Sequence, residues 1–224
     1  MIRFENVTKV FALEGKRKVV AQNINLTFPT GRSVGLLGQN GAGKSTMLQM
    51  IAGTLTPTSG RIISTGAISF PVGYAGSFHP ELSGAQNARF VARIYGVDTD
   101  ELVDFVEDFA GLGVHFHLPF RSYSSGMKSR LAFGVSMGIG FDTYLVDEVT
   151  AVGDAAFRAR SHMVFKERMK RAGAVVVTHS MQQVRELCDA TAVLNNGRLT
   201  YYDNVEQGII AHSKNMAALN APQQ

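Results

Sequence analysis

The chain has 224 residues, of which 45% are hydrophobic and 18% charged, a composition typical of a folded globular protein with a sizeable core. It contains no stretch of about eighteen apolar residues, so we expect no membrane-spanning helix. Its single cysteine, Cys188, excludes an internal disulfide and is expected to be a small buried apolar group. The net charge is +4, but the basic run Lys16-Arg17-Lys18 has no interleaved aromatic residues. We therefore interpret the basic charge as a solvated surface, with a surface that lies beneath an anionic membrane leaflet as the alternative, and expect no nucleic-acid partner.

The first seventy residues predict short strands. Ile2, Phe4 and Val7 indicate a first strand. A second, half-buried strand is indicated by even spacing of the apolar residues Val20, Ile24, Leu26 and Phe28. A continuous apolar run at 34–37 is typical of a buried strand, and shorter candidates follow at 62–63 and 67–70.

A glycine-rich loop follows the apolar run and opens onto a helix that begins at Lys44. The loop and the start of the helix read Gly38-Gln39-Asn40-Gly41-Ala42-Gly43-Lys44-Ser45-Thr46, with P-loop spacing. Glycines let consecutive backbone N–H groups converge on one point, and the helix adds the positive end of its dipole. Lys44 can reach the β- and γ-phosphates, and the Ser45 hydroxyl can bind Mg²⁺. The sequence thus predicts a nucleoside triphosphate site; the alternative is a glycine-rich turn that binds nothing.

The stretch from about residue 78 to 140 predicts helices. Ser83 followed by Gln86 has the form of a capping box, which would begin a helix that ends near Tyr95. Asp98 and Glu101 repeat this spacing before an amphipathic stripe that consists of Leu102, Phe105, Val106, Phe109 and Ala110. After a loop at 111–122, Tyr123-Ser124-Ser125-Gly126-Met127-Lys128 leads into another helix. We expect an inserted helical subdomain.

Apolar strands and helices alternate again beyond residue 140. We expect strands at 144–146 and 174–177, and helices at 155–171 and 181–188. The segments 190–194 and 198–202 flank an Asn-Gly turn typical of a hairpin, and a short helix near 204–212 precedes a polar tail at 213–224. Such alternation predicts an α/β fold with a mostly parallel sheet covered on both faces.

Two acidic residues follow the strand at 144–146. A P-loop needs a carboxylate at a neighbouring strand tip to hold Mg²⁺, and Asp147 suits that role. Glu148 would then project toward the γ-phosphate, where it could polarise an attacking water. Without a P-loop, the same pair would indicate only the start of a loop or a helix cap.

His179 stands just after the next apolar strand, at 174–177. An isolated histidine is usually structural or a surface residue. In a parallel sheet, however, the carboxyl ends of the strands meet at one edge, where His179 could donate to a γ-phosphate oxygen. We therefore predict Lys44, Glu148 and His179 as the catalytic groups.

The small residues Ser124-Ser125-Gly126 lead directly into a helix, a geometry that offers backbone N–H groups and a hydroxyl to an anion. With the P-loop, the paired acids and the histidine, this segment resembles the signature motif of the ATP-binding cassette (ABC) ATPases. The resemblance covers about residues 1–212 as one cassette. It implies a P-loop ATPase core with an N-terminal antiparallel β-subdomain and the helical subdomain at about 78–140. In that family the signature segment contacts ATP held by a second, head-to-tail subunit, which implies a homodimer with ATP and Mg²⁺ as cofactors.

Two further positions match the family. Phe11, after the first strand, matches an aromatic residue that stacks on adenine, although a core phenylalanine is the alternative. Asp154 matches the D-loop aspartate between the two ATP sites, and a surface helix cap is its alternative. The implied nucleotide-binding residues are Phe11, Gly38, Asn40, Gly41, Ala42, Gly43, Lys44, Ser45, Thr46, Ser124, Ser125, Gly126 and Asp154, and the implied metal ligands are Ser45 and Asp147.

The chain also departs from the common family pattern. Most members have a glutamine near residues 68–72, whereas this chain reads Phe70-Pro71-Val72-Gly73-Tyr74, which leaves Tyr74 or a backbone group as a substitute. Ser125 and Met127 stand where glycine and glutamine are commoner. Together with Phe90-Val91-Ala92-Arg93 and Thr150-Ala151-Val152-Gly153-Asp154, these features resemble the ATPase subunit of capsular polysaccharide exporters. O-antigen and teichoic-acid exporter ATPases share part of this pattern.

The resemblance implies an ATPase that drives lipid-linked capsular polysaccharide across the inner membrane. It would lie at the cytoplasmic face, peripheral to the membrane, under two copies of a separate permease that link it to periplasmic and outer-membrane export components. The alternatives are an O-antigen or teichoic-acid exporter, a soluble ABC ATPase that acts on DNA or ribosomes, and a catalytically dead cassette. A soluble ATPase of that kind would have a long coiled-coil insertion or two cassettes, and this chain has neither.

Overall fold

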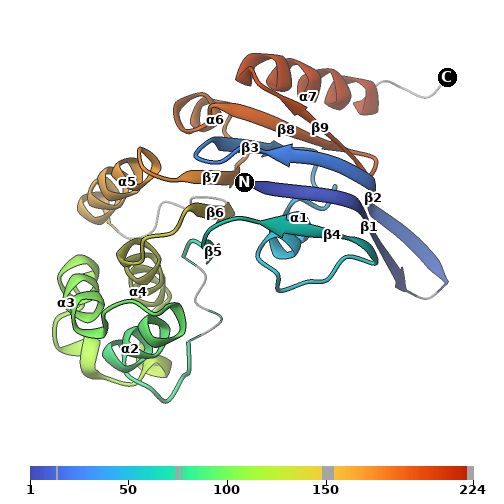
Figure 1. Cartoon of the computed structure of the whole chain (residues 1–224). Coiled ribbons are helices and arrows are strands. Elements are labelled where there is room, and N and C mark those ends of the chain that lie inside the picture. The colour runs from blue at the N-terminus through green and yellow to red at the C-terminus, as the bar shows by residue number, and fades with distance from the viewer. Residues whose placement is uncertain (14, 74–75, 77, 148–153, 221–224) are drawn as a thin grey trace. The chain divides into compact units, whose positions relative to one another are not determined.

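The computed structural model describes residues 1–13, 15–73, 76, 78–147 and 154–220 (Figure 1). In this part of the chain the residues form two compact units. The core unit contains Met1–Ile68, 142–147 and 171–220, and the helical unit contains Ser69–Phe141 and 154–170. None of the described helices is both long enough and apolar enough to cross a bilayer.

The core unit begins with an antiparallel sheet in the order β2-β1-β4, formed by β1 (Ile2–Leu13), β2 (Lys16–Phe28) and β4 (Ser59–Ser64). Register shifts between Phe4 and Val10 allow β1 to follow β2 to the end of their hairpin. Phe11 therefore lies inside β1. The prediction that it follows the first strand is wrong, because pairing with β2 extends the strand beyond the apolar pattern.

A second sheet has the order β5-β6-β7-β3-β8-β9. Its strands are β3 (Ser33–Leu37), β5 (Ile68–Pro71), β6 (Thr143–Asp147), β7 (Gly173–Val177), β8 (Ala190–Asn195) and β9 (Arg198–Tyr202). β6, β7, β3 and β8 run parallel, whereas β9 is antiparallel to β8 across a turn in which Asn196 and Gly197 have φ values of 48° and 77°. The carboxyl ends of the four parallel strands consequently share one edge.

Different helices cover the two faces of the parallel strands. Leu36 belongs to one apolar core with Met47 and Leu48 of α1 (Lys44–Ile51) and with residues of the antiparallel sheet. On the opposite face Gly35 approaches α6 (Met181–Leu187), where a Cβ would lie 2.9 Å from Val184 Cγ1. Successive residues of a strand point to opposite faces, which explains the two environments and the continuous apolar sequence of β3.

The last helix, α7 (Val205–Asn220), is longer than the sequence predicts. It begins beyond the end of β9, beside the start of β8, and runs along that strand (Figure 1). Gly208 lets the helix approach the sheet, because a Cβ at this position would overlap Thr191 Oγ1. The short helix expected at 204–212 continues through most of the expected polar tail, since packing of one face stabilises turns that sequence alone does not favour.

The helical unit contains α2 (Gly84–Tyr95), α3 (Thr99–Ala110), α4 (Ser125–Gly138) and α5 (Ala155–Met169), with the short 3₁₀ turns η1 (Gly113–His117) and η2 (Phe120–Ser122). Phe109 stacks on Phe133 with ring centroids 5.8 Å apart and meets Phe157 edge-on at 5.3 Å, which joins α3, α4 and α5.

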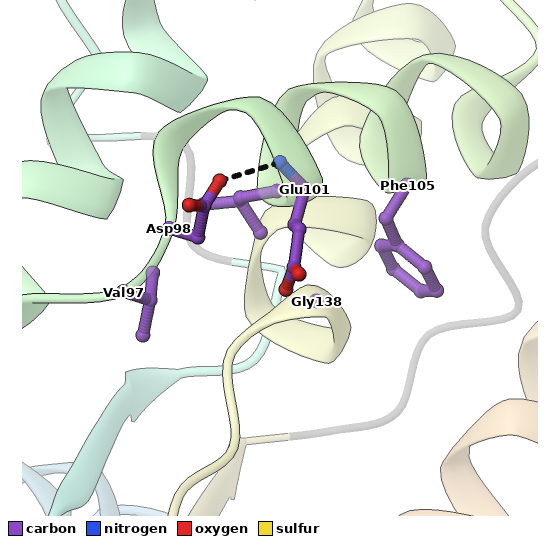
Figure 2. Close-up of a pocket in the computed structure, with 6 residues that line it drawn as sticks. Val97, Asp98, Glu101, Phe105 and Gly138 are labelled. Atoms are coloured by element: carbon purple, nitrogen blue, oxygen red, sulfur yellow. Dashed lines mark hydrogen bonds between the residues drawn. The ribbon is translucent and has the colours of Figure 1, made fainter.

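The helices α2 and α3 both begin at residues whose side chains cap them. The capping box predicted at Ser83 and Gln86 is present: Ser83 Oγ accepts from Gln86 N at 3.2 Å, and Gln86 Oε1 accepts from Ser83 N at 2.9 Å. Asp98 accepts from the backbone N–H groups of Asp100 and Glu101, both at 2.9 Å, and Figure 2 shows the second of these bonds. The boundaries of these helices follow from local sequence.

Candidate nucleotide-binding site

The glycine-rich loop lies close against two strands. A Cβ on Gly38 would lie 2.6 Å from the carbonyl oxygen of Leu194 in β8. Gly43 has a φ of 106°, and a Cβ on it would overlap Val20 of β2. Both positions therefore require glycine, Gly43 for its backbone conformation as well as for space.

The loop leads into a helix whose N-terminus has no side-chain cap. Gly43 is the N-cap residue of α1, and the first turn contains no acidic residue. The first N–H groups of a helix have no intrahelical partner, and the peptide dipoles give this end a partial positive charge. Asn40, Gly41 and Ser45 beside it are exposed, whereas Ala42 and Thr46 are half-buried. This arrangement suits a phosphate group.

Lys44 lies inside the loop and is 9% exposed. Its Nζ donates to the carbonyl oxygens of Gly38 at 2.8 Å and Gln39 at 3.1 Å. A bound phosphate would compete with these carbonyls for the ammonium group, and the charged oxygen is the stronger partner. Lys44 is thus positioned at the loop that would hold the phosphates.

Strand register places Asp147 and His179 at the same sheet edge as the loop. Gly35 of β3 pairs with Val176 of β7, and Asp147, the last residue of β6, pairs with Val177. His179, two residues beyond Val177, is exposed, and Asp147 is half-buried. With strands about 4.8 Å apart, Asp147 lies two strands from β3 and its loop. Glu148 lies outside the described residues.

This sheet edge suits Mg²⁺ that is held jointly with a nucleotide. Among the described residues, no group of three or more His, Cys, Asp or Glu side chains is arranged to hold a metal ion. Mg²⁺ commonly binds through one or two protein oxygens, with phosphate oxygens and waters completing its octahedron. The exposed Ser45 hydroxyl and the Asp147 carboxylate fit this partial donor set.

Phe11 is not a core residue, because its side chain is 41% exposed. The ammonium group of Lys9 lies 5.0 Å from the centroid of its ring and donates to the Thr56 carbonyl at 2.8 Å. Phe11 therefore presents part of an anchored aromatic ring to solvent, as a residue that stacks on a base must.

The helical unit carries the predicted signature segment at the start of α4. Ser124 is the N-cap, and its Oγ accepts from Met127 N at 3.3 Å. Ser124, Ser125 and Gly126 are all exposed. A serine hydroxyl that accepts one hydrogen bond retains its own O–H donor, so capping the helix leaves Ser124 able to donate to an anion.

Asp154 caps α5, as the alternative to its D-loop role foresaw. Its carboxylate accepts from Phe157 N at 2.9 Å and from the guanidinium of Arg130 in α4 at 2.7 Å. The bond from the Phe157 N–H, followed by the bond from Arg130, lowers the pKa of Asp154. The Arg130 guanidinium also lies 4.9 Å from the ring centroid of Phe157. Asp154 is thus an anchored carboxylate, and these contacts are compatible with a D-loop role.

His212 of α7 is a basic residue near the loop that the sequence analysis did not identify. It lies one turn beyond Gly208, on the face of α7 that packs on the sheet. Burial, followed by the charge of Lys44 and that of His179, lowers the pKa of His212. Only the extension of α7 along β8 brings this residue toward the loop, and no local motif indicated it.

A pocket between α3 and the end of α4 has the wrong chemistry for a nucleotide. It is lined by Val97, Asp98, Glu101, Leu102, Phe105 and Gly138, most of which are labelled in Figure 2. Its charged side chains are acidic and would repel phosphates, and the rest of the lining is apolar or glycine. We interpret this pocket as a gap in the packing between the two helices.

Two further expectations concern Tyr74 and Cys188. Tyr74, which the sequence offered as a substitute for the missing glutamine, lies outside the described residues. Cys188 is 8% exposed, as expected for a small buried apolar group, and burial raises the pKa of its thiol to about 12.

Comparison with known proteins identifies the class. The family model described as "ABC transporter" matches residues 21–151, more than half of the chain. The dimeric post-hydrolysis structure of the ATP-binding cassette MJ0796 with ADP and Pi has a TM-score of 0.75 at 21% identity, over 89% of this chain and 96% of the other. The chain belongs to the ABC transporter ATPase family and is an ATP-binding and ATP-hydrolysing protein with the cassette fold.

Several ATP-binding proteins are similar to this chain over nearly their whole length. The polysialic acid transport ATP-binding protein KpsT of Escherichia coli is 48% identical over 93% of this chain and 95% of its own. The ATP-binding protein BexA of Haemophilus influenzae is 40% identical over 92% and 95%, respectively. The capsule polysaccharide export ATP-binding protein CtrD of Neisseria meningitidis serogroup B is 39% identical over 92% and 96%.

Proposed function

We propose that this chain is the ATPase subunit of an exporter that drives lipid-linked capsular polysaccharide across the inner membrane. Its place would be at the cytoplasmic face, peripheral to the membrane. The observation that carries the proposal is similarity, over more than nine-tenths of the chain, to proteins named for the transport of polysialic acid and capsule polysaccharide. The uncapped N-terminus of α1 and the buried Lys44 support ATP as the energy source.

In the proposed reaction, the loop and the first turn of α1 bind the phosphates, and Lys44 exchanges its carbonyl partners for phosphate oxygens. Ser45 and Asp147 would hold Mg²⁺, which when bound would supply positive charge against the phosphates. Glu148 accepts a proton from the attacking water, while His179 donates to a γ-phosphate oxygen and orients the group. Phe11 stacks on the adenine.

We further propose a homodimer in which Ser124, Ser125 and Gly126 of one subunit contact ATP bound by the other. The exposed N-terminus of α4 and the remaining hydroxyl donor of Ser124 support this role. Such an interface is isologous, since each subunit offers the same two surfaces. ATP contacts both subunits only in the closed dimer, so loss of the γ-phosphate weakens closure. Asp154 would lie between the two sites.

The outer surface of α2 is the proposed contact with the permease. Phe90 and Ile94, one helical turn apart, are 52% and 62% exposed, and exposed Arg89 and Arg93 lie beside them. Such an apolar pair with a basic border suits a membrane subunit that presents a helix at the anionic cytoplasmic surface. We propose two copies of a separate permease, which would also connect the dimer with periplasmic and outer-membrane export components.

Replacement of Glu148 tests the catalytic assignment. Glu148→Gln keeps the shape of the side chain but cannot accept the proton, so ATP turnover should fall about 100-fold or more while ATP binding persists. ATP should then trap a closed dimer, which size-exclusion chromatography would detect. Lys44→Ala is the control that should lose binding itself. Near-normal hydrolysis by Glu148→Gln would contradict the assigned role.

The transport assignment is tested by purification of the chain with its membrane partner in detergent. We expect a polysaccharide permease to co-purify, and a lipid-linked capsular polymer to stimulate ATP turnover. A Phe90→Asp/Ile94→Asp variant should lose the permease but retain the turnover of the isolated chain. Stimulation by an O-antigen or teichoic-acid glycolipid instead would overturn the proposed substrate. Co-purification of a permease of another class would overturn the transport assignment but not the ATPase activity.

A further inference from the structure

The basic run Lys16-Arg17-Lys18 does not form a single charged surface. It begins β2, where successive side chains point to opposite faces of the sheet. Lys18 pairs with Phe11 of β1, and Arg17 pairs with Ala12. Because directly opposed residues of antiparallel strands share a face, Lys18 lies beside the exposed ring of Phe11, whereas Arg17 points to the other face.

The same face of β2 lies against the glycine-rich loop. Val20, two residues after Lys18, lies so close to Gly43 that a Cβ on this glycine would overlap it. Lys18 lies beside another glycine of the loop, Gly41, because a Cβ on Gly41 would lie 3.8 Å from Lys18 Nζ. Two side chains of one strand thus line two glycines of the loop, one with an apolar contact and the other with an ammonium group.

Within the part of the chain that the structure describes, the ammonium group of Lys18 has no acidic partner. Throughout the described residues, no ion pair or hydrogen bond joins it to another group. Arg3 and Arg61, also in the antiparallel sheet, both pair with Glu5, and Lys9 is bonded to the Thr56 carbonyl. An unpaired cation at the rim of a phosphate-binding loop is suited to an anionic ligand.

We propose that Lys18 is a further nucleotide-binding residue, whose ammonium group contacts the phosphate chain of ATP at Gly41. This inference rests on the proposed nucleotide site. Phe11 would hold the base and Lys18 the phosphates, so two adjacent residues of the hairpin bind the two ends of one nucleotide. The loop N–H groups and Lys44 bind the phosphates from the α1 side, and Lys18 adds a contact from β2.

The test measures the dissociation constants of ATP, ADP and adenosine for the purified full chain, before turnover. Lys18→Met should weaken ATP about three- to tenfold, the range of a solvent-exposed charged contact with a phosphate, and should leave adenosine unchanged. Lys18→Arg should restore most of the ATP affinity. The loss should shrink as salt is raised, because the contact is exposed.

Two control variants remove the same unit of charge from the same hairpin. Lys16→Met and Arg17→Met should leave ATP affinity within about twofold, because neither residue is placed at Gly41. Equal losses of ATP affinity in all three variants would mean that only the overall positive charge of the hairpin matters, which would overturn the proposal. An unchanged ATP affinity in Lys18→Met, or an equal loss for adenosine, would also overturn it.

The nucleotide site itself is checked separately in the same experiment. Wild-type chain should bind ATP, and Lys44→Ala should not. Failure of either expectation would overturn the proposed site and the role of Lys18 with it, whereas a normal response to Lys44→Ala with no effect of Lys18→Met would overturn the role of Lys18 alone. A circular dichroism melt shows whether each variant is folded.

Discussion

Two helix N-termini of this protein, those of α1 and α2, differ in whether side chains bond to their first backbone N–H groups, which have no partner within the helix. At α2, Ser83 and Gln86 bond to each other's backbone N–H groups, so that the helix satisfies itself. At α1, the N-cap is Gly43 and no side chain offers a bond. The difference separates a structural helix start from one kept available for a ligand.

The start of α4 combines a side-chain cap with a group that remains available for a ligand. Ser124 caps the helix by accepting from Met127 N, yet it is exposed and its hydroxyl can still donate. In the proposed dimer, one residue therefore stabilises its own helix and contacts a nucleotide bound to the other subunit. Substitutions of the three N-cap residues, Gly43, Ser83 and Ser124, test this comparison.

The largest effect is expected from Gly43→Ala, at the N-cap of α1. The new Cβ would overlap Val20 at a backbone φ of 106°, so left-handed strain and overpacking together should lower the free energy of unfolding by about 2–4 kcal/mol. ATP binding should also be lost. Chemical denaturation and nucleotide titration measure the two effects.

Gly53→Ala is the matched control. Gly53 has a φ of 75°, but a Cβ there would meet no atom within 4 Å. Only the backbone strain remains, so the cost should be about 1–2 kcal/mol with ATP affinity unchanged. An equal cost at both glycines would show that the contact with Val20 does not matter.

An intermediate effect is expected from the two serine caps. Ser83→Ala and Ser124→Ala should each lower the free energy of unfolding by about 1 kcal/mol, because each removes one N-cap bond. Only Ser124→Ala should also reduce ATP turnover, by about tenfold, through the lost hydroxyl donor. Equal turnover in the two variants would restrict Ser124 to its structural role.

The smallest effect is expected from His212. Its pKa is lowered in the folded protein, mainly by burial, so the unfolded chain binds the extra proton more readily. The free energy of unfolding should therefore fall as the pH drops below about 6.5, the ordinary pKa of histidine. His212→Gln should make this fall shallower.

Denaturation at pH 7.5, 6.5 and 5.5 measures this dependence. The exposed His115→Gln serves as the matched substitution and should follow the wild-type curve. If His212→Gln destabilises equally at all three pH values, the side chain contributes packing alone.

The local features of this protein could be predicted from its sequence. The P-loop spacing, the capping box at Ser83 and the Asn196-Gly197 turn depend on φ preferences and hydrogen bonds between residues a few positions apart. For that reason the start of α1 at Lys44 and the hairpin that closes the sheet agree with the structure.

Long-range pairing determined the rest. Phe11 lies within β1 because the strand pairs with β2 up to the hairpin, and α7 reaches Asn220 because its inner face packs along β8. The same register separates Lys18 from Arg17 and brings it to Gly41, although the three basic residues look alike in sequence. Composition and spacing alone predicted a phosphate-binding loop. Only the tertiary structure decided which strands and helices surround this loop, because strand register and helix packing join residues far apart in the chain.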